Sequence, residues 1–211
     1  MNSQDATVLV VDDDPSVRKA LARLLQAAGL KVQTFTSAVE FLDQGAPAGL
    51  GCLLLDVRMP GLSGLDLQAE LNKRNIHIPI IFMTGQGDIP MTVRAMKGGA
   101  TDFLTKPLRD KDLLVLIREA IKKHQLLLAD QAEKAVIQGR IESLSPRERQ
   151  VLMLVVKGLM NKEIADVLSA AEKTIKVHRG RMMHKMQVES VAELVRDVEL
   201  VTPQSEAPSP P

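Results

Sequence analysis

The chain is poor in aromatic residues: its 211 residues include four Phe and no Tyr or Trp. All four phenylalanines fall in the first half, so a second domain must pack on aliphatic side chains and methionine. No apolar run approaches the roughly 20 residues that a membrane-spanning helix needs. The N-terminus also lacks the basic-then-apolar pattern of a secretory signal. These absences predict a cytoplasmic protein with no membrane partner.

Cysteine is nearly absent too. Cys52 is the only one, so an intrachain disulfide is excluded, and its apolar surroundings predict a buried, inert thiol. The four histidines lack the spacing of a metal site, which favours structural or solvent-facing roles for them. A hydrophobic content of 45% allows one or two domains with substantial cores.

Four short apolar runs in the first half each end in a polar residue. The polar residues at these ends are Asp12 with Asp13, Asp56, Thr84 and Lys106. Bare apolar runs separated by helical periodicity indicate buried strands of a parallel sheet. Because parallel strands end at a common edge, where ligands bind in such folds, these side chains are expected to converge there.

Strands and helices are expected to alternate over the first half. The expected strands are residues 7–11, 32–35, 52–55, 78–83 and 102–104. The expected helices are residues 15–28, a short one capped by Ser37 with Glu40 in capping-box register, 65–73 and 90–97. Five such units predict an α/β fold, a doubly wound five-stranded parallel sheet of flavodoxin-like order.

The chemistry at this edge follows from charge. Asp12, Asp13 and Asp56 would repel one another without a counter-ion, so a hard divalent cation is expected among them. Mg²⁺ suits such a site, because it binds through one or two carboxylates and keeps several of its water ligands. Lys106 can neutralise the oxygens of an incoming phosphoryl group, and Thr84 can donate a hydrogen bond to one of them. Asp56, alone on its strand, is the natural nucleophile, and its product is an aspartyl phosphate.

Each of these residues also has an ordinary explanation when it is considered alone. The aspartates before Pro15 would suit a helix cap, and Asp14 is expected to be one. Thr84 alone would suit a turn, and Lys106 alone would suit a solvated surface. It is the ordered set, with each member at a strand end, that favours a site.

Residues 6–124 resemble the receiver domain of bacterial two-component response regulators. The motifs VLVVDDDPSVR, LLLDVRMPGLSGLDL, IIFMTGQGD and AMKGGATDFLTKP match in order and spacing. The resemblance implies phosphorylation at Asp56 by a sensor histidine kinase. It also implies Mg²⁺ held by Asp13 and Asp56 with help from Asp12, phosphoryl contacts from Thr84 and Lys106, a switch aromatic at Phe103 and a cis bond before Pro107.

Residues 125–143 are expected to form a helical linker. The helical pattern that begins at Arg109 predicts a helix of about 25 residues, nearly 40 Å long at the standard rise. Two interpretations stay open: the helix pairs with its twin in a dimer, or it faces its own core and frays near Gly139.

Residues 144–200 are expected to be all helical. Ser145 opens a helix that reaches Lys157, Asn161 caps residues 162–168, another helix covers 172–186, and Ser190 caps a last helix that ends near Glu199. A short helix, a tight turn and a longer basic helix predict a helix-turn-helix. Residues 201–211 are rich in proline and serine and are expected to be disordered.

The basic helix has two distinct faces at 100° per residue. Ile175, Met182 and Met186 form the predicted core stripe. The opposite side carries Lys173, Val177, Gly180, Arg181 and His184, with Lys176 flanking. Between residues 172 and 185 there are five basic residues and one acid, although the whole chain has a net charge of +1. This local charge favours phosphate contacts, and a basic solvated face without a ligand is the alternative.

The segments LSPRERQVLMLVVKGLMNKEIADVL and EKTIKVH resemble the LuxR-type domain. Its pairing with this receiver is similar to the FixJ/NarL group of transcription regulators, and closest to the FixJ branch. The resemblance implies that Lys176 and Val177 contact base edges. It also implies phosphate contacts from Lys173, Thr174 and Arg181. Gly180 departs from the larger residue often found there, which would either permit closer approach to DNA or weaken recognition.

The sequence as a whole predicts a phosphorylation-dependent transcription regulator rather than an enzyme. The phosphorylated chain is expected to dimerise and to bind operator DNA, with RNA polymerase as a further partner. One alternative is a constitutive DNA-binding regulator whose receiver is not phosphorylated. The other, an Asp-nucleophile phosphohydrolase, is disfavoured because Arg58 stands where such enzymes have a second aspartate.

Overall fold

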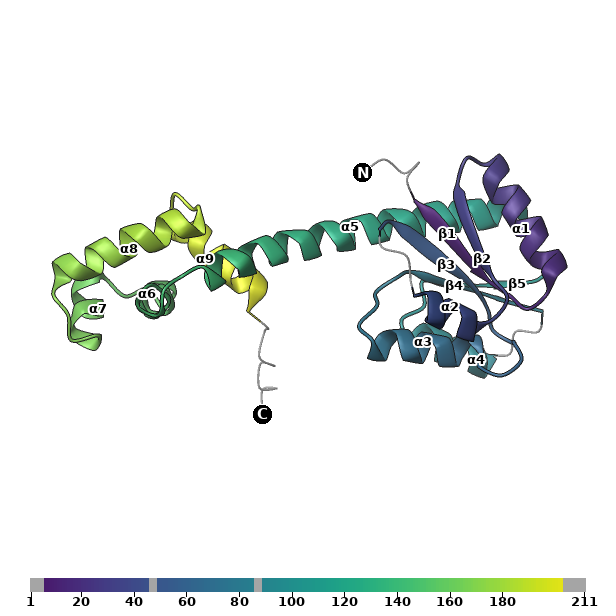
Figure 1. The fold of residues 1–211 in the computed structure, drawn as a ribbon, viewed down its shortest axis with the longest axis horizontal. Helices are drawn as coiled ribbons and strands as arrows, with labels where there is room; N and C mark the ends of the chain where they lie inside the picture. Colours follow the sequence, from purple (N-terminus) through teal and green to yellow (C-terminus); the bar gives the residue numbers. More distant parts are fainter. Residues whose placement is uncertain (1–5, 46–48, 86–88, 203–211) are drawn as a thin grey trace. The chain divides into compact units, whose positions relative to one another are not determined.

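The structure, a computed structural model, describes residues 6–45, 49–85 and 89–202. It divides into two compact units, Met1–Leu128 and Ala129–Pro211. Each unit has the class of fold that its sequence predicts: the first is α/β and the second is all helical (Figure 1). The expected disordered tail lies outside the described residues except for Val201 and Thr202, and Val201 ends the last helix.

The first unit is built on a five-stranded parallel sheet with the predicted flavodoxin-like order β2-β1-β3-β4-β5. The strands are β1 (Thr7–Val11), β2 (Lys31–Phe35), β3 (Gly51–Asp56), β4 (Ile80–Thr84) and β5 (Asp102–Thr105). β4 begins two residues later than expected, because Pro79 has no N–H to donate to the ladder. Every residue of β3 and β4 is buried, as the bare apolar runs indicate.

Helices cover both faces of this sheet. They are α1 (Pro15–Ala27), α2 (Ala38–Gln44), α3 (Gly64–Lys73), α4 (Ile89–Lys97) and the first part of α5 (Asp110–Glu142). Buried side chains of α2, α3 and α4 share one core with the sheet, and those of α1 and α5 share the other (Figure 1). Cys52 lies fully buried in the second core, as predicted.

Two caps differ from the pattern expected for them. Ser37 does accept the backbone N–H of Glu40, but the Glu40 carboxylate accepts from Thr36, so the reciprocal half of the predicted capping box is missing. A complete capping box forms at α3, where Ser63 and Asp66 bond each other's backbone N–H. α3 therefore begins at Gly64, one residue earlier than expected.

α5 is longer than the sequence pattern predicts. It has 33 residues, which corresponds to about 50 Å at the standard rise. The interpretation that it frays near Gly139 is wrong, because the helix runs through Gly139 to Glu142. Leu113 and Ile117 of α5 are buried in the core of the first unit, and Ile137 is buried in the core of the second.

The second unit packs four further helices around an aliphatic and methionine core. They are α6 (Pro146–Val156), α7 (Asn161–Val167), α8 (Glu172–Met186) and α9 (Val191–Val201). Asn161 is not the predicted cap of α7: Met160 holds the N-cap position, and the Asn161 side-chain oxygen accepts from Arg179 of α8 at 2.9 Å. The asparagine is thus used for a contact between helices instead of a cap.

A buried carboxylate joins α6 to α8. Glu148 completes the capping box of α6 with Ser145, and its Oε2 accepts from Lys185 Nζ at 2.7 Å. Lys185 also donates to the Ser143 carbonyl at 3.2 Å. The hydrogen bond from Lys185, followed by the one from the Ser145 backbone, lowers the pKa of Glu148 to about 2.

This ion pair predicts an acid-sensitive contribution to stability. Because the pKa of Glu148 falls from 4.5 in the unfolded chain to about 2, the contribution is complete above pH 4.5 and is lost as the pH falls toward 2. Glu148→Gln should lower the unfolding free energy by about 1 to 2 kcal/mol near neutral pH and by much less in acid. Urea unfolding followed by circular dichroism at several pH values measures both.

The matched control is Glu142→Gln, which removes the same charge from an exposed side chain. Its effect should stay within about 0.5 kcal/mol at every pH. Equal losses in the two variants, or a Glu148→Gln loss that does not change with pH, would contradict the role given to the ion pair.

Candidate functional site

The carboxyl edge of the sheet gathers the side chains that the sequence places at strand ends. Asp12 follows β1, Asp56 ends β3, Thr84 ends β4 and Lys106 follows β5. Asp12, Asp56 and Thr84 are buried, and Lys106 is half-buried. Burying a charged carboxylate costs free energy unless a positive charge pairs with it, so the contacts that Lys106 makes with Asp12 and Asp56 matter most here.

Lys106 joins the two carboxylates. Its Nζ donates to Asp12 Oδ2 at 2.7 Å and to Asp56 Oδ1 at 2.8 Å. Burial alone would lower the pKa of Lys106, but the hydrogen bonds to these two carboxylates outweigh burial and raise it. The ammonium is therefore charged. The Lys106–Pro107 peptide bond is cis, as the receiver resemblance implies.

Asp56 is held by groups on both of its oxygens. Oδ1 accepts from Lys106, and Oδ2 accepts from the Arg58 backbone N–H at 2.9 Å. Burial raises the pKa of Asp56 and the neighbouring Asp12 carboxylate adds to this, while Lys106 and the Arg58 N–H act in the opposite direction. Burial prevails, so the pKa of Asp56 lies above its usual value, and Lys106 offsets only part of that shift.

The three consecutive aspartates have different positions. Asp12 is fully buried, and its Oδ1 accepts from the Asp14 N–H at 2.9 Å. Asp14 caps α1 by accepting from Ser16 N, as predicted. Asp13 is exposed beside them, and the described residues contain no ready-made cluster of three or more His, Cys, Asp or Glu side chains in metal-binding geometry.

Thr84 and Phe103 lie on the neighbouring strands β4 and β5. The Thr84 carbonyl accepts from the Lys106 backbone N–H at 2.7 Å, which ties the loop after β5 to the end of β4. Phe103 is half-buried, and its ring centroid lies 6.5 Å from that of Phe82. The part of the IIFMTGQGD motif at residues 86–88 lies outside the described residues.

Sequence reasoning missed two supports of this edge. Arg18 Nη1 donates to the Asp12 carbonyl at 2.6 Å, a contact that only the packing of α1 reveals. Gly64 donates its N–H to the Val57 carbonyl, and a β-carbon on Gly64 would overlap the Asp56 carbonyl oxygen. The glycine at the start of α3 was the available signal for this close approach.

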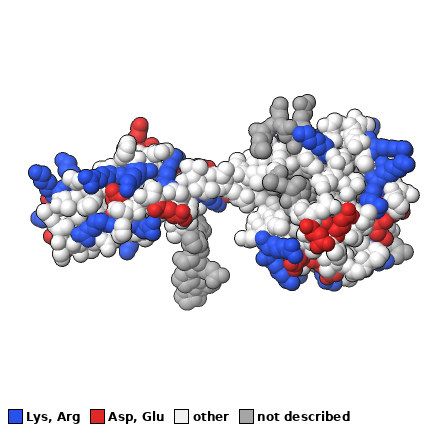
Figure 2. All heavy atoms as spheres, viewed as in Figure 1, with Lys and Arg blue, Asp and Glu red and all other residues white. Residues whose placement is uncertain are grey.

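In the second unit, α8 buries the predicted stripe and exposes the predicted DNA face. Ile175, Met182 and Met186 are fully buried. The five residues predicted to contact DNA are all exposed: Lys173, Thr174, Lys176, Val177 and Arg181. Figure 2 shows Lys and Arg side chains spread over the visible face of this unit.

Two of the five basic residues counted on α8 are bonded within the unit. Arg179 donates to Asn161, and Lys185 donates to Glu148 and to the Ser143 carbonyl. The exposed basic residues of the DNA face are therefore Lys173, Lys176 and Arg181, fewer than the sequence count suggested. In the described part of the chain no helix is long and apolar enough to cross a membrane.

Two family models match the chain, one for each unit. The response regulator receiver domain matches residues 8–118, and the luxR family of bacterial regulatory proteins matches residues 142–198. The chain is 52% identical over 194 residues to Nodulation protein W of Bradyrhizobium diazoefficiens, covering 92% of this chain and 86% of that protein. The chain belongs to the response regulator family.

Other relatives agree with this assignment. The Transcriptional regulatory protein FixJ of Azorhizobium caulinodans is 47% identical, with 90% of each chain covered. Among solved structures, the response regulator StyR has a TM-score of 0.82 at 48% identity, covering 92% of this chain and 98% of StyR. Full-length FixJ from B. japonicum has a TM-score of 0.58 at 42% identity, covering 93% and 97%. This response regulator thus combines a receiver with a LuxR-type DNA-binding domain and acts as a transcription regulator.

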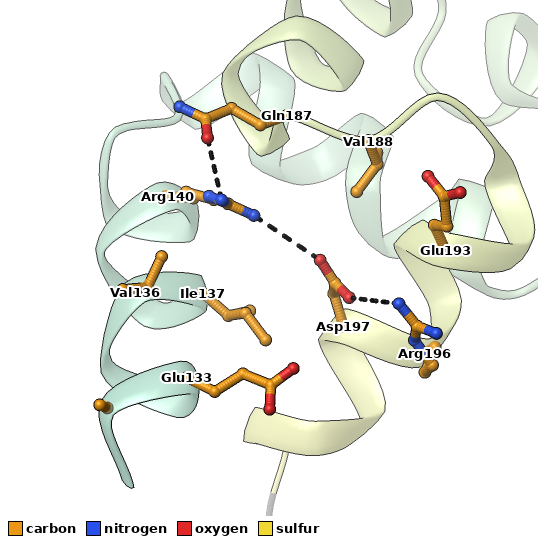
Figure 3. Close-up of a pocket in the computed structure, with 10 residues that line it drawn as sticks. Glu133, Val136, Ile137, Arg140, Gln187, Val188, Glu193, Arg196 and Asp197 are labelled. Atoms are coloured by element: carbon orange, nitrogen blue, oxygen red, sulfur yellow. Dashed lines mark hydrogen bonds and ion pairs between the residues drawn. The ribbon is translucent and has the colours of Figure 1, made fainter. Parts of the chain in front are cut away.

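The DNA-binding unit of this response regulator also contains a polar clamp that the sequence did not reveal. Arg140, on the last part of α5, donates to the Met186 carbonyl at the end of α8 and to Gln187 Oε1 at 2.9 Å. It also faces the buried Asp197 of α9 at 3.9 Å. Figure 3 shows Arg140, Gln187 and Asp197 beside a cavity between α5 and α9. The cavity has a volume of about 450 Å³.

The close approach of Gly64 to the Asp56 backbone predicts that any side chain at position 64 destabilises this response regulator. Gly64→Ala should destabilise the receiver unit by about 1 to 3 kcal/mol, because the backbone must shift to relieve the overlap. The shift should also displace the strand end that carries Asp56, and labelling of the receiver unit by acetyl phosphate should then be slower. Urea unfolding and the rate of labelling by acetyl phosphate measure the two effects.

Gly85→Ala serves as the control for stability, because a β-carbon on Gly85 would meet no atom of the described residues within 4 Å. That variant should unfold within about 0.5 kcal/mol of the wild type. A Gly64→Ala chain as stable as Gly85→Ala would show that the overlap is relieved without cost.

Proposed function

We propose that Asp56 is the phosphoacceptor of this regulator. The observation that supports the proposal is the single charged Lys106 bonded to two buried carboxylates, Asp12 and Asp56, at the sheet edge. In the proposed step, an oxygen of Asp56 attacks the phosphorus of a phosphohistidine on a sensor kinase. The phosphorus–nitrogen bond breaks, its electron pair returns to the histidine ring, and an aspartyl phosphate forms.

The other residues of the edge have distinct proposed roles. Lys106 moves its hydrogen bonds from the carboxylates to the new phosphoryl oxygens, which carry more charge than the aspartate did. Thr84 turns its hydroxyl to donate to one of those oxygens. Phe103, on the neighbouring strand, follows Thr84 and changes the surface near α4 and β5.

Mg²⁺ is the cofactor proposed for this step. The edge fits a hard cation, because it offers carboxylate oxygens from the buried Asp12 and Asp56 and from the exposed Asp13, which follows Asp12 in the chain. Asp13 and Asp56 would hold the ion, with Asp12 assisting. When bound, Mg²⁺ supplies positive charge that offsets the repulsion between the carboxylates and the phosphoryl group.

We also propose how phosphorylation reaches DNA. Phosphorylated chains form a homodimer, which suits operators with two related half-sites. On each chain Lys176 and Val177 contact base edges, while Lys173, Thr174 and Arg181 contact phosphates. RNA polymerase is a proposed further partner, and the cytoplasm, where DNA and kinase meet the protein, is its proposed location.

The second candidate is a constitutive regulator whose receiver is not phosphorylated. The paired Asp12, Asp56 and Lys106 argue against it, because a receiver without a phosphoryl group to bind has no need for two buried carboxylates around one ammonium. Labelling with acetyl phosphate distinguishes the two candidates directly.

The phosphoacceptor assignment predicts that Asp56→Asn abolishes Mg²⁺-dependent labelling, because an amide oxygen is a poor nucleophile. The fold of the variant should stay intact. The control is Asp102→Asn, an equivalent change at the start of β5, where the carboxylate accepts only from the Phe103 N–H among the bonds described. Phosphoprotein gels and circular dichroism measure labelling and fold.

Sedimentation of the same samples tests the coupling to dimerisation. Labelled wild type and Asp102→Asn should move toward the dimer, and Asp56→Asn should not. Full labelling of Asp56→Asn would refute the assignment. A labelled wild type that binds DNA more tightly at unchanged mass would instead refute dimerisation as the route.

The DNA face predicts a difference between base and phosphate contacts. Lys176→Ala or Val177→Ala should cost on the order of 1 to 3 kcal/mol on a duplex that the wild type selects, and much less on random DNA. Arg181→Ala should weaken binding to both duplexes alike and lower the salt slope by roughly 1, since about one fewer counterion is released.

Titrations of both duplexes at several salt concentrations measure these quantities. Lys162→Ala, an exposed basic residue on α7, is the control for general loss of positive charge. If Arg181→Ala lost only the selected duplex while Lys176→Ala weakened both equally, the two roles would be exchanged and the docking of α8 would be rotated about its axis.

A further inference from the structure

Gly180 is an unusual residue for the middle of the DNA-contacting helix. Glycine inside a helix costs about 1 kcal/mol relative to alanine, so a helix-interior glycine needs a reason. Gly180 lies inside α8, with eight helical residues before it and six after it. It is exposed, and it is absent from the glycines with positive φ, so the backbone conformation does not require it.

The packing of the chain does not require this glycine either. A β-carbon built on Gly180 would meet no atom within 4 Å. By contrast, a β-carbon on Gly51 or Gly64 would overlap a backbone oxygen of a neighbouring segment. Nothing in the described residues therefore requires a glycine at position 180.

The surroundings of Gly180 identify the kind of partner. At 100° per residue, it lies opposite the buried Met182 and within about 60° of Lys173, Lys176, Val177 and His184. All four of these neighbours are exposed, and two of them are lysines. The centre of this basic face is thus the one place on α8 without a side chain.

Gly139 shows that an open glycine alone would not suffice. It is also exposed, helix-interior and free of any atom within 4 Å of an added β-carbon. However, its neighbours one turn away on α5 include Ala135, Val136 and Glu142, which do not form a basic face. The surroundings of Gly139 therefore do not point to a polyanionic partner, and Gly139 serves as a matched control for Gly180.

We infer that Gly180 is a close-approach position, where the backbone of α8 lies directly against double-stranded DNA. A helix with its side chains is about 10 to 12 Å across, nearly the 12 Å width of the major groove, so one side chain on the facing line limits how deeply the helix enters. The missing side chain lets α8 sit deeper and brings Lys176 and Val177 within reach of base edges. This inference rests on the proposed DNA docking of α8.

The test compares alanine and leucine at both glycines in the full-length phosphorylated chain. The probes are a duplex that the wild type enriches from a random-sequence pool, and the unselected pool itself. Gly180→Ala and Gly139→Ala should both raise the Tm of the DNA-binding unit by about 4 to 8 °C, since each removes a helix-interior glycine. Only the Gly180 variants should lose DNA affinity.

For the enriched duplex we expect binding about tenfold weaker in Gly180→Ala and weaker still in Gly180→Leu, comparable to the loss of a base contact. Both Gly139 variants should bind as the wild type does. Wild-type affinity in both Gly180 variants would overturn the inference, and so would a lower Tm of Gly180→Ala, because the chain itself would then require the glycine.

The experiment distinguishes failure of the proposed DNA docking from failure of the inference about Gly180. If the phosphorylated wild type enriched no duplex, DNA docking of α8 would be refuted and the inference would fall with it. If the wild type enriched a duplex that the Gly180 variants bound equally well, the inference alone would be refuted.

Discussion

Charge pairing at the sheet edge is the constraint on which the receiver depends. Asp12 and Asp56 are buried and share the ammonium of Lys106, and without that ammonium the two carboxylates would repel each other. The same ammonium is attracted more strongly by a phosphoryl group than by either carboxylate. If Asp56 accepts a phosphoryl group as proposed, an arrangement that is satisfied in the resting state then has a reason to rearrange.

A comparable set of charged contacts organises the DNA-binding unit. Two hydrogen bonds join α5 and α8 near their C-terminal ends. Arg140 of α5 donates to the Met186 carbonyl, and Lys185 of α8 donates to the carbonyl of Ser143, the residue after α5. Within this unit the last residues of α5 are thus part of the fold that supports α8, the helix proposed to contact DNA. A displacement of Arg140 would change the end of α8 directly.

The sequence predicted the features that local chemistry determines. Strand ends, the sheet order, the cap at Asp14 and the buried stripe of α8 follow from apolar runs, cap residues and helical periodicity, and all are present. The missed features depend on segments distant in the chain. Nothing near Asn161 indicates that Arg179 will occupy its side chain, and nothing near Gly139 indicates that contacts of Ile137 will continue the helix.

Contacts with distant segments also limit how well the charge of a DNA-binding surface can be estimated from sequence. Five basic residues between 172 and 185 suggest a dense cationic helix, yet Arg179 and Lys185 are used to hold α8 against α7 and α6. Counterion release depends only on cations that reach phosphates. On α8 itself, fewer cations are available to phosphates than the sequence count suggests, so a close fit of this helix, as proposed for Gly180, would contribute more to its affinity for DNA.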